Sequence, residues 1–109
     1  YVVEPVGAAI LAGEPVSYPN HRIQGGGYAM ADLPLLDPAH VDGYLQVSDN
    51  EAITVTRRLA REEGIFCGIS SGGALSIALR ISRQVQNSTI VFIVCDRGDR
   101  YLSTGVFPA

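Results

Sequence analysis

The sequence contains no lysine and no tryptophan among its 109 residues. All eight basic residues are arginines. Because a lysine amine is the side-chain group that forms a Schiff base with a carbonyl compound, the chain cannot complete such chemistry with its own side chains. No apolar stretch approaches the ~18 residues of a membrane span, and no charged segment followed by an apolar one resembles a signal peptide, so we expect neither.

Basic stripes are also missing, and the formal net charge is −3. A chain of this kind has no surface that neutralises phosphates, so we expect no nucleic-acid partner and no membrane partner. Cys67 and Cys95 have apolar neighbours, and we interpret them as two buried, reduced thiols, although a disulfide between them stays open. Reduced thiols are typical of the cytoplasm, where we expect the protein to act.

The residues that are present indicate a folded chain with a core. Hydrophobic residues make up 47% of the sequence and charged residues 17%, which is typical of one globular domain over residues 1–109. The first residues, Tyr-Val-Val-Glu-Pro, read as the end of a buried strand, and no methionine precedes them. We therefore expect the chain to be a piece of a longer protein.

Turn-forming residues dominate the first 42 positions. We expect a strand over residues 1–3 that stops at Pro5, and a helical turn or two over 7–12 that closes at Gly13. Residues 14–34 predict a long loop, a feature that is often functional in compact domains. A short helical turn is expected around residues 38–40.

The next segment predicts a strand followed by a well-defined helix. Residues 43–47 read as the strand. Ser48 and Glu51 have the spacing of a capping box, which predicts a helix that opens at Ser48. Gly64 is the expected residue at its C-terminal cap.

A second helix and a third strand are predicted after Gly64. Apolar residues at helical spacing predict a helix that begins at Ser70 or Ser71 and fades by about residue 86. The β-branched run over 89–95 predicts a strand that is buried inside a parallel sheet. The polar loop over 96–100 follows at the carboxyl end of that strand, where open α/β sheets bind ligands. The predicted fold class is α/β, with a partial parallel sheet and flanking helices.

The start of the second helix is a candidate binding site. Small residues and two hydroxyls occupy residues 68–74, where unpaired backbone N–H groups and a partial positive charge favour a polar or anionic ligand. Ser70 and Ser71 have a simpler interpretation as N-caps, each worth about 1 kcal/mol.

Two runs carry a resemblance to a known family. The first is Glu-Gly-Ile-Phe-Cys-Gly-Ile-Ser-Ser-Gly-Gly-Ala at 63–74, and the second is Cys-Asp-Arg-Gly-Asp-Arg-Tyr-Leu-Ser-Thr at 95–104. Together they resemble the C-terminal part of cysteine synthases (O-acetylserine sulfhydrylases), and the second run is most similar to the B-type isozyme. These are fold type II pyridoxal-phosphate enzymes, so the resemblance implies a three-layer α/β/α architecture.

The resemblance implies an activity, a cofactor and partners. The activity is β-replacement of O-acetylserine with sulfide to give cysteine and acetate, and the cofactor is pyridoxal 5′-phosphate. The implied partners are a small amino-acid substrate, a second subunit in a homodimer and a serine acetyltransferase. In the family, the Schiff-base lysine and the phosphate loop belong to the N-terminal part. They have no counterpart here, so we expect no catalytic residue in this chain and no activity from it alone.

The resemblance also implies roles for single residues. It places Ser70 against the pyridine nitrogen of the cofactor, which leaves helix capping to Ser71. A neutral hydroxyl suits an unprotonated ring nitrogen, and hence β-replacement more than transamination. Gln24 and Gly25 fall in the loop at the substrate entrance, but Gly25-Gly26-Gly27 departs from the family pattern there, so their contacts with substrate or partner stay open.

Other interpretations stay open at this point. The chain could belong to another fold type II enzyme, such as a cystathionine β-synthase or a serine/threonine dehydratase, or it could be a non-catalytic association module. His21 and His40 lie far apart in the sequence without ligand-spaced partners, so we expect no metal site. The charged residues of the loop over 96–100 form either a polar network at the site or a solvated, salt-bridged surface.

Overall fold

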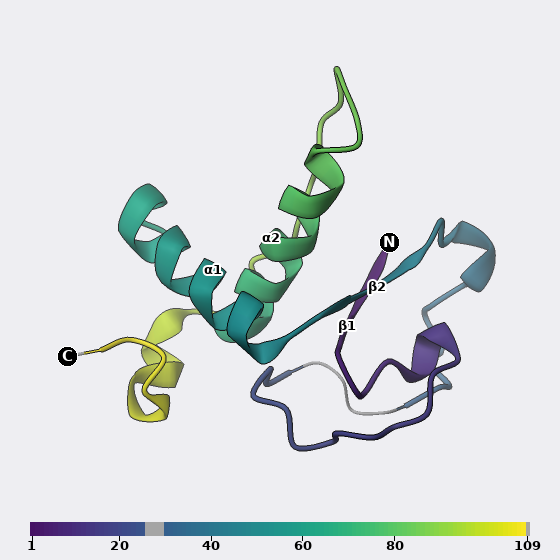
Figure 1. Ribbon diagram of the computed structural model, residues 1–109, viewed down its shortest axis with the longest axis horizontal. Helices are drawn as coiled ribbons and strands as arrows, with labels where there is room; N and C mark the ends of the chain where they lie inside the picture. The colour runs from purple at the N-terminus through teal and green to yellow at the C-terminus, as the bar shows by residue number, and fades with distance from the viewer. Residues whose placement is uncertain (26–29, 109) are drawn as a thin grey trace.

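The computed structural model describes residues 1–25 and 30–108. Its elements, in chain order, are β1 (Val2–Pro5), η1 (Ile10–Ala12), η2 (Pro38–His40), β2 (Tyr44–Val47), α1 (Asp49–Glu63), α2 (Ile69–Ser82) and η3 (Gly98–Thr104). The two strands pair in parallel, with Val2 opposite Tyr44 and Pro5 opposite Val47. α2 packs against both strands, and α1 continues from the end of β2 and packs against α2 (Figure 1). The predicted α/β class, with a partial parallel sheet and flanking helices, is confirmed.

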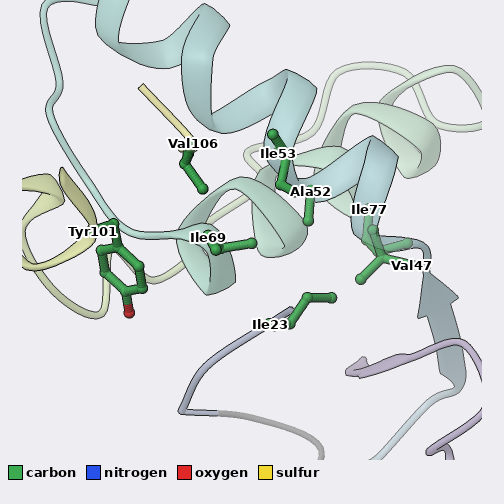
Figure 2. Close-up of a cluster of buried hydrophobic side chains, with 8 residues drawn as sticks. All are labelled: Ile23, Val47, Ala52, Ile53, Ile69, Ile77, Tyr101 and Val106. Carbon is green, nitrogen blue, oxygen red and sulfur yellow. The ribbon is translucent and has the colours of Figure 1, made fainter. Parts of the chain in front are cut away.

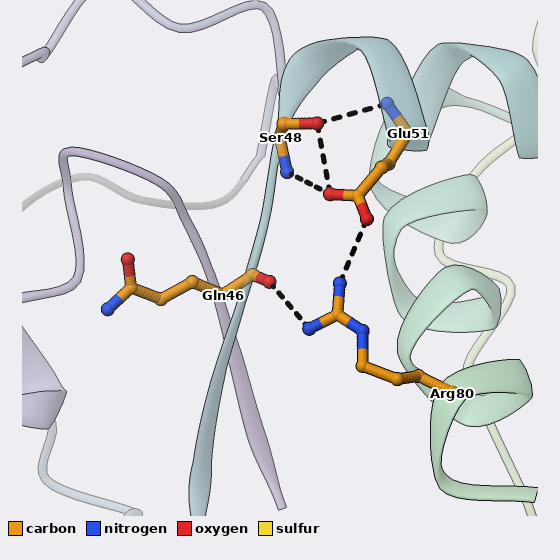
Figure 3. A network of polar contacts seen from close by, with 4 residues as sticks. All are labelled: Gln46, Ser48, Glu51 and Arg80. Carbon is orange, nitrogen blue, oxygen red and sulfur yellow. Dashed lines mark hydrogen bonds and ion pairs between the residues drawn. The ribbon is translucent and has the colours of Figure 1, made fainter. Parts of the chain in front are cut away.

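The N-terminus of α1 follows the prediction closely. The Ser48 hydroxyl accepts a hydrogen bond from the Glu51 N–H, and the Glu51 carboxylate accepts one from the Ser48 N–H, which completes the capping box. Arg80 of α2 extends this network, because it donates to the Glu51 carboxylate at 2.9 Å and to the Gln46 carbonyl at 3.2 Å (Figure 3). Gly64 caps the other end of α1 with a left-handed φ of 70°. One arginine thus ties β2, α1 and α2 together.

α2 begins earlier than predicted. Its first residue is Ile69 and its N-cap is Gly68, so neither Ser70 nor Ser71 caps it. The reason lies in the packing of the preceding turn. A Cβ atom at Gly68 would lie 2.1 Å from Asp96 Oδ1, so only glycine lets the chain turn here against the loop after residue 95. The helix ends at Ser82, short of the predicted end.

A compact apolar cluster joins the two helices to the end of β2, to the loop at Ile23 and to the C-terminal segment. Its buried members are Ile23, Val47, Ala52, Ile53, Ile69, Ile77, Tyr101 and Val106 (Figure 2). Val47 and Ala52 flank the capping box on either side, as expected for a hydrophobic staple. The cluster therefore fixes the start of α2 against the end of β2.

The predicted strand over residues 89–95 is wrong, since the segment forms no strand and pairs with no strand among the described residues. A cavity of about 490 Å³ separates it from β1, with α2 as the third wall. Val91 and Ile93 are 80% and 67% exposed, although the pattern predicted burial on both faces. A strand requires a neighbouring strand at about 4.8 Å. On the side of β1, the segment borders the cavity and has no such neighbour. In the described part of the chain, no helix is both long and apolar enough to cross a membrane.

Candidate functional site

The carboxyl ends of β1 and β2 open onto a cavity of about 210 Å³. The strands, the loop before the first undescribed residues, the first turns of α2 and the end of the 89–95 segment all contribute to it. The lining residues are Val3, Glu4, Pro5, Ile23, Gly25, Val47, Ser70, Gly73, Ala74 and Cys95. Because α/β sheets bind ligands at the carboxyl ends of their strands, this cavity is the candidate functional site.

Ser70 and Ser71 have different surroundings. Ser70 is half-buried and lines the cavity, and no hydrogen bond joins its hydroxyl to another described residue. Ser71 is fully buried, and its hydroxyl accepts a hydrogen bond from the Cys95 N–H at 3.0 Å. The expected capping role of Ser71 is therefore wrong, because its hydroxyl holds the 89–95 segment against α2 instead.

The small residues of the turn also have separate functions. A Cβ atom at Gly72 would lie 1.9 Å from Thr56 Oγ1, so this glycine allows α1 and α2 to approach closely. Gly73 and Ala74 line the cavity beside Ser70. The run of small residues thus serves helix packing at one position and the cavity at others.

The two loop residues expected at the substrate entrance, Gln24 and Gly25, have different surroundings. Gly25 lines the cavity and has a left-handed φ of 82°. Gln24 is exposed and is not among the lining residues. Gly26 and Gly27 lie outside the described residues. The structure therefore brings Ser70 and Gly25 to one cavity, and leaves Gln24 at its outer side.

Glu4 is a member of the site that the sequence did not reveal. It is 5% exposed, and its carboxylate accepts hydrogen bonds from the Leu11 and Ala12 N–H groups at 3.1 and 3.2 Å. These bonds hold η1 at the end of β1. A carboxylate just before a proline at the end of an apolar strand was the available signal, but its partners are defined only by the fold.

The loop over 96–100 combines a buried part and a solvated part. The Tyr101 hydroxyl donates to Asp96 Oδ2, and burial together with this carboxylate raises the pKa of Tyr101 to about 12. Asp96 Oδ1 is buried and has no hydrogen-bond partner among the described residues. Arg97 and Asp99 form an exposed ion pair at 2.8 Å. The solvated interpretation therefore holds for Arg97 and Asp99, whereas no residue of this loop lines the cavity.

The two cysteines are free, as expected, but only Cys67 is buried. Burial raises the pKa of the Cys67 thiol, which keeps it protonated. Cys95 is exposed and lines the cavity, so its predicted burial is wrong. Among residues 1–25 and 30–108, no group of histidine, cysteine and acidic side chains could hold a metal ion.

The cavity is lined mostly by apolar side chains. Ile23, Val47 and Ala74 supply apolar walls, and the Ser70 hydroxyl is a polar group of the lining that has no hydrogen-bond partner among the described residues. The first turn of α2 adds backbone N–H groups that have no partner within the helix. The cavity can therefore accept a mostly apolar group that carries a hydrogen-bond acceptor beside Ser70.

Comparison with known proteins agrees with the resemblance in the sequence. Cysteine synthase B of Pseudomonas aeruginosa is 55% identical over 73 residues, which are 67% of this chain and 24% of that protein. Cysteine synthase A of Escherichia coli is 43% identical over 107 residues, which are 94% of this chain and 32% of that protein. The chain therefore spans about a third or less of the length of these relatives.

Solved structures show the same architecture. The cysteine synthase of Entamoeba histolytica matches 98% of this chain with a TM-score of 0.89 and 32% identity, over 31% of its own length. An O-acetylserine dependent cystathionine beta-synthase from Helicobacter pylori matches 96% with a TM-score of 0.80 and 36% identity, over 33% of its length. The family model for pyridoxal-phosphate dependent enzymes matches residues 1–96. With these matches, the predicted cofactor is confirmed as that of the family, and the chain belongs to the pyridoxal-phosphate dependent enzymes.

Proposed function

We propose that the chain is the C-terminal part of a cysteine synthase that replaces the acetate of O-acetylserine with sulfide to give cysteine. The names of the relatives with the higher identities support this activity. The observation that carries the proposal is the unpartnered Ser70 hydroxyl in a cavity at the carboxyl ends of two parallel strands. Since the chain has no lysine, the reactive amine belongs to another part of the enzyme.

In this proposal Ser70 contacts the pyridine nitrogen of pyridoxal phosphate. When bound, the cofactor supplies an electron sink for the bonds at the substrate Cα and Cβ atoms. The Ser70 hydroxyl donates a hydrogen bond to the nitrogen and, being neutral, does not hold a proton on it. The partial positive charge at the start of α2 also disfavours that proton. Such a ring suits loss of a leaving group from Cβ.

The other lining residues hold the ring and keep water away. Ile23 and Val47 are both buried in the core cluster, so their side chains form a firm apolar wall. Gly25 brings backbone to the cavity without a side chain, and we place the amino-acid substrate on this side. Gln24 lies at the outer edge of the same loop, where it reaches substrate as the substrate enters.

Two measurements test the proposed activity. The complete polypeptide that contains this chain should form cysteine from O-acetylserine and sulfide. The 109-residue chain alone should form no cysteine. When its N-terminal amine is blocked and pyridoxal phosphate is added, it should show no visible absorption band of a Schiff base. Cystathionine formation from homocysteine, or release of ammonia from serine, in place of cysteine formation would favour the other fold type II enzymes.

A second candidate function is association with further polypeptide. The 490 Å³ cavity beside the exposed Val91 and Ile93 is apolar surface that a soluble monomer rarely leaves open. Light scattering of the purified chain tests this, and a stable monomer at high concentration would count against it. For the complete enzyme we further propose a homodimer in the cytoplasm, with serine acetyltransferase as a partner.

A further inference from the structure

The loop that forms one wall of the cavity is held from outside by Arg22. The Arg22 N–H donates a hydrogen bond to Asp49 Oδ1 at 2.9 Å. Its side-chain Nη2 donates to the Thr104 carbonyl at 2.7 Å. Asp49 is the first residue of α1 and Thr104 is the last residue of η3. One residue thus connects the cavity loop to two elements that are distant in the sequence.

The residues that follow Arg22 reach the cavity at once. Ile23 is 5% exposed and inserts into the core cluster beside Val47 and Ile69 (Figure 2). Gly25, two residues further along the chain, lines the cavity together with Ile23. The place of Gly25 relative to Ser70 therefore depends on where the chain is fixed just before Ile23, and Arg22 provides that fixed point.

A second arginine offers a matched comparison. Arg57 of α1 donates hydrogen bonds to the carbonyls of Gly105 and Val106, directly after the Thr104 carbonyl that Arg22 contacts. Both arginines therefore hold the same C-terminal segment. Arg57 does not line the cavity, and among the described residues its side-chain hydrogen bonds go to that segment.

We propose that Arg22 is a positioning residue, which fixes the loop over 22–25 between α1 and η3. It thereby sets the position of the cavity wall that contacts the amino-acid substrate. The part that concerns substrate rests on the proposed function. The part that concerns the loop stands on the two hydrogen bonds and on the burial of Ile23.

Hydrogen–deuterium exchange of the complete polypeptide that contains this chain tests the loop. Arg22→Ala removes the contact with the Thr104 carbonyl and keeps the backbone bond to Asp49, so exchange of the residue 22 amide that makes this bond should speed up about five-fold as the loop opens more often. Arg57→Ala should speed exchange after residue 104 and leave the residue 22 amide within about two-fold of the parent. Equal effects of both variants on the loop, or no effect of Arg22→Ala, would overturn the proposal.

Conservative variants keep the test decisive if Arg22→Ala does not fold. Arg22→Lys retains a donor for the Thr104 carbonyl and should restore slow exchange. Asp49→Ala removes the other anchor, whereas Asp49→Asn retains the accepting oxygen, so only the alanine variant should speed loop exchange. The reverse order within either pair would contradict the assignment.

Kinetics of the complete holoenzyme test the consequence for substrate. Arg22→Ala should raise KM for the amino-acid substrate about three- to ten-fold with kcat changed less than about two-fold, because a displaced wall weakens binding and not the chemical step. Arg57→Ala should change neither. A fall in kcat with constant KM would overturn the positioning role. If the parent enzyme forms no cysteine, the proposed function fails, while the exchange result still decides the role of Arg22 in the loop.

Discussion

Gly72 has no room for a side chain, because its ideal Cβ position lies 1.9 Å from Thr56 Oγ1 and 2.3 Å from the Ala52 carbonyl. We therefore predict that Gly72→Ala lowers the free energy of unfolding by about 2–3 kcal/mol, since α1 and α2 must move apart. This loss should exceed the gain of about 1 kcal/mol in helix propensity. Urea denaturation followed by circular dichroism measures it.

Gly73→Ala is the matched control, because its Cβ would lie 3.3 Å from Val47 Cγ1, a contact that a small shift relieves. Its cost should stay below about 1 kcal/mol. Equal stability losses for the two variants would show that the close approach at Gly72 is not what sets the helix spacing.

The raised pKa of Tyr101 predicts that the free energy of unfolding depends on pH in the alkaline range. Its pKa in the folded chain is raised to about 12 by burial and by the Asp96 carboxylate. An unfolded tyrosine titrates near 10, so between these values the folded state retains a proton that the unfolded state has lost. The stabilisation by Tyr101 is thus complete below about pH 10 and is lost as the pH rises toward 12.

Denaturation at a series of alkaline pH values checks this effect. The free energy of unfolding should fall more steeply above about pH 10 in the parent than in Tyr101→Phe, which has no proton to lose at this position. Identical slopes in the two proteins would contradict a raised pKa at Tyr101.

At the scale of elements, α1 depends on the chemistry of its own ends. Ser48→Ala removes the hydroxyl that accepts from the Glu51 N–H, and we predict a loss of about 1 kcal/mol in the free energy of unfolding. Thr54→Ala changes an exposed position in the middle of the same helix and should not destabilise the chain. If thermal unfolding gives both variants the same stability, the capping box contributes nothing measurable.

The sequence predicts an element well when the interacting residues are close together in the chain, and poorly when they are far apart. The capping box at Ser48 and the left-handed cap at Gly64 depend on residues within one or two turns, and the sequence predicts both. The start of α2 depends on contacts of Gly68 with Asp96 and Tyr101, which are distant in the chain. The sequence therefore places α2 correctly but misses its first residue and the role of Ser71.

The segment over 89–95 shows the same limit more clearly. Its β-branched composition predicts a strand, but a strand also needs a neighbouring strand within hydrogen-bonding distance. In the described chain that place beside β1 is a cavity. Composition alone cannot report which neighbours are present.

For the whole molecule, the candidate site is a meeting point of separate segments. Ser70 and Gly25 were predicted from the sequence, and the fold brings them to one cavity. Glu4 and Ile23 were not predicted, because their places depend on β1 and on the core cluster. In the proposed function the chain supplies one wall of the cofactor site, and the reactive amine belongs to another part of the enzyme.

The absorption spectrum of the bound cofactor tests the central claim most directly. In the complete holoenzyme, Ser70→Ala should shift the visible band of pyridoxal phosphate and weaken its retention about three- to ten-fold, as expected for one lost hydrogen bond. Ser76→Ala, in α2 but outside the cavity lining, should leave both unchanged. An unaltered spectrum and unaltered retention in Ser70→Ala would contradict the contact between Ser70 and the cofactor ring.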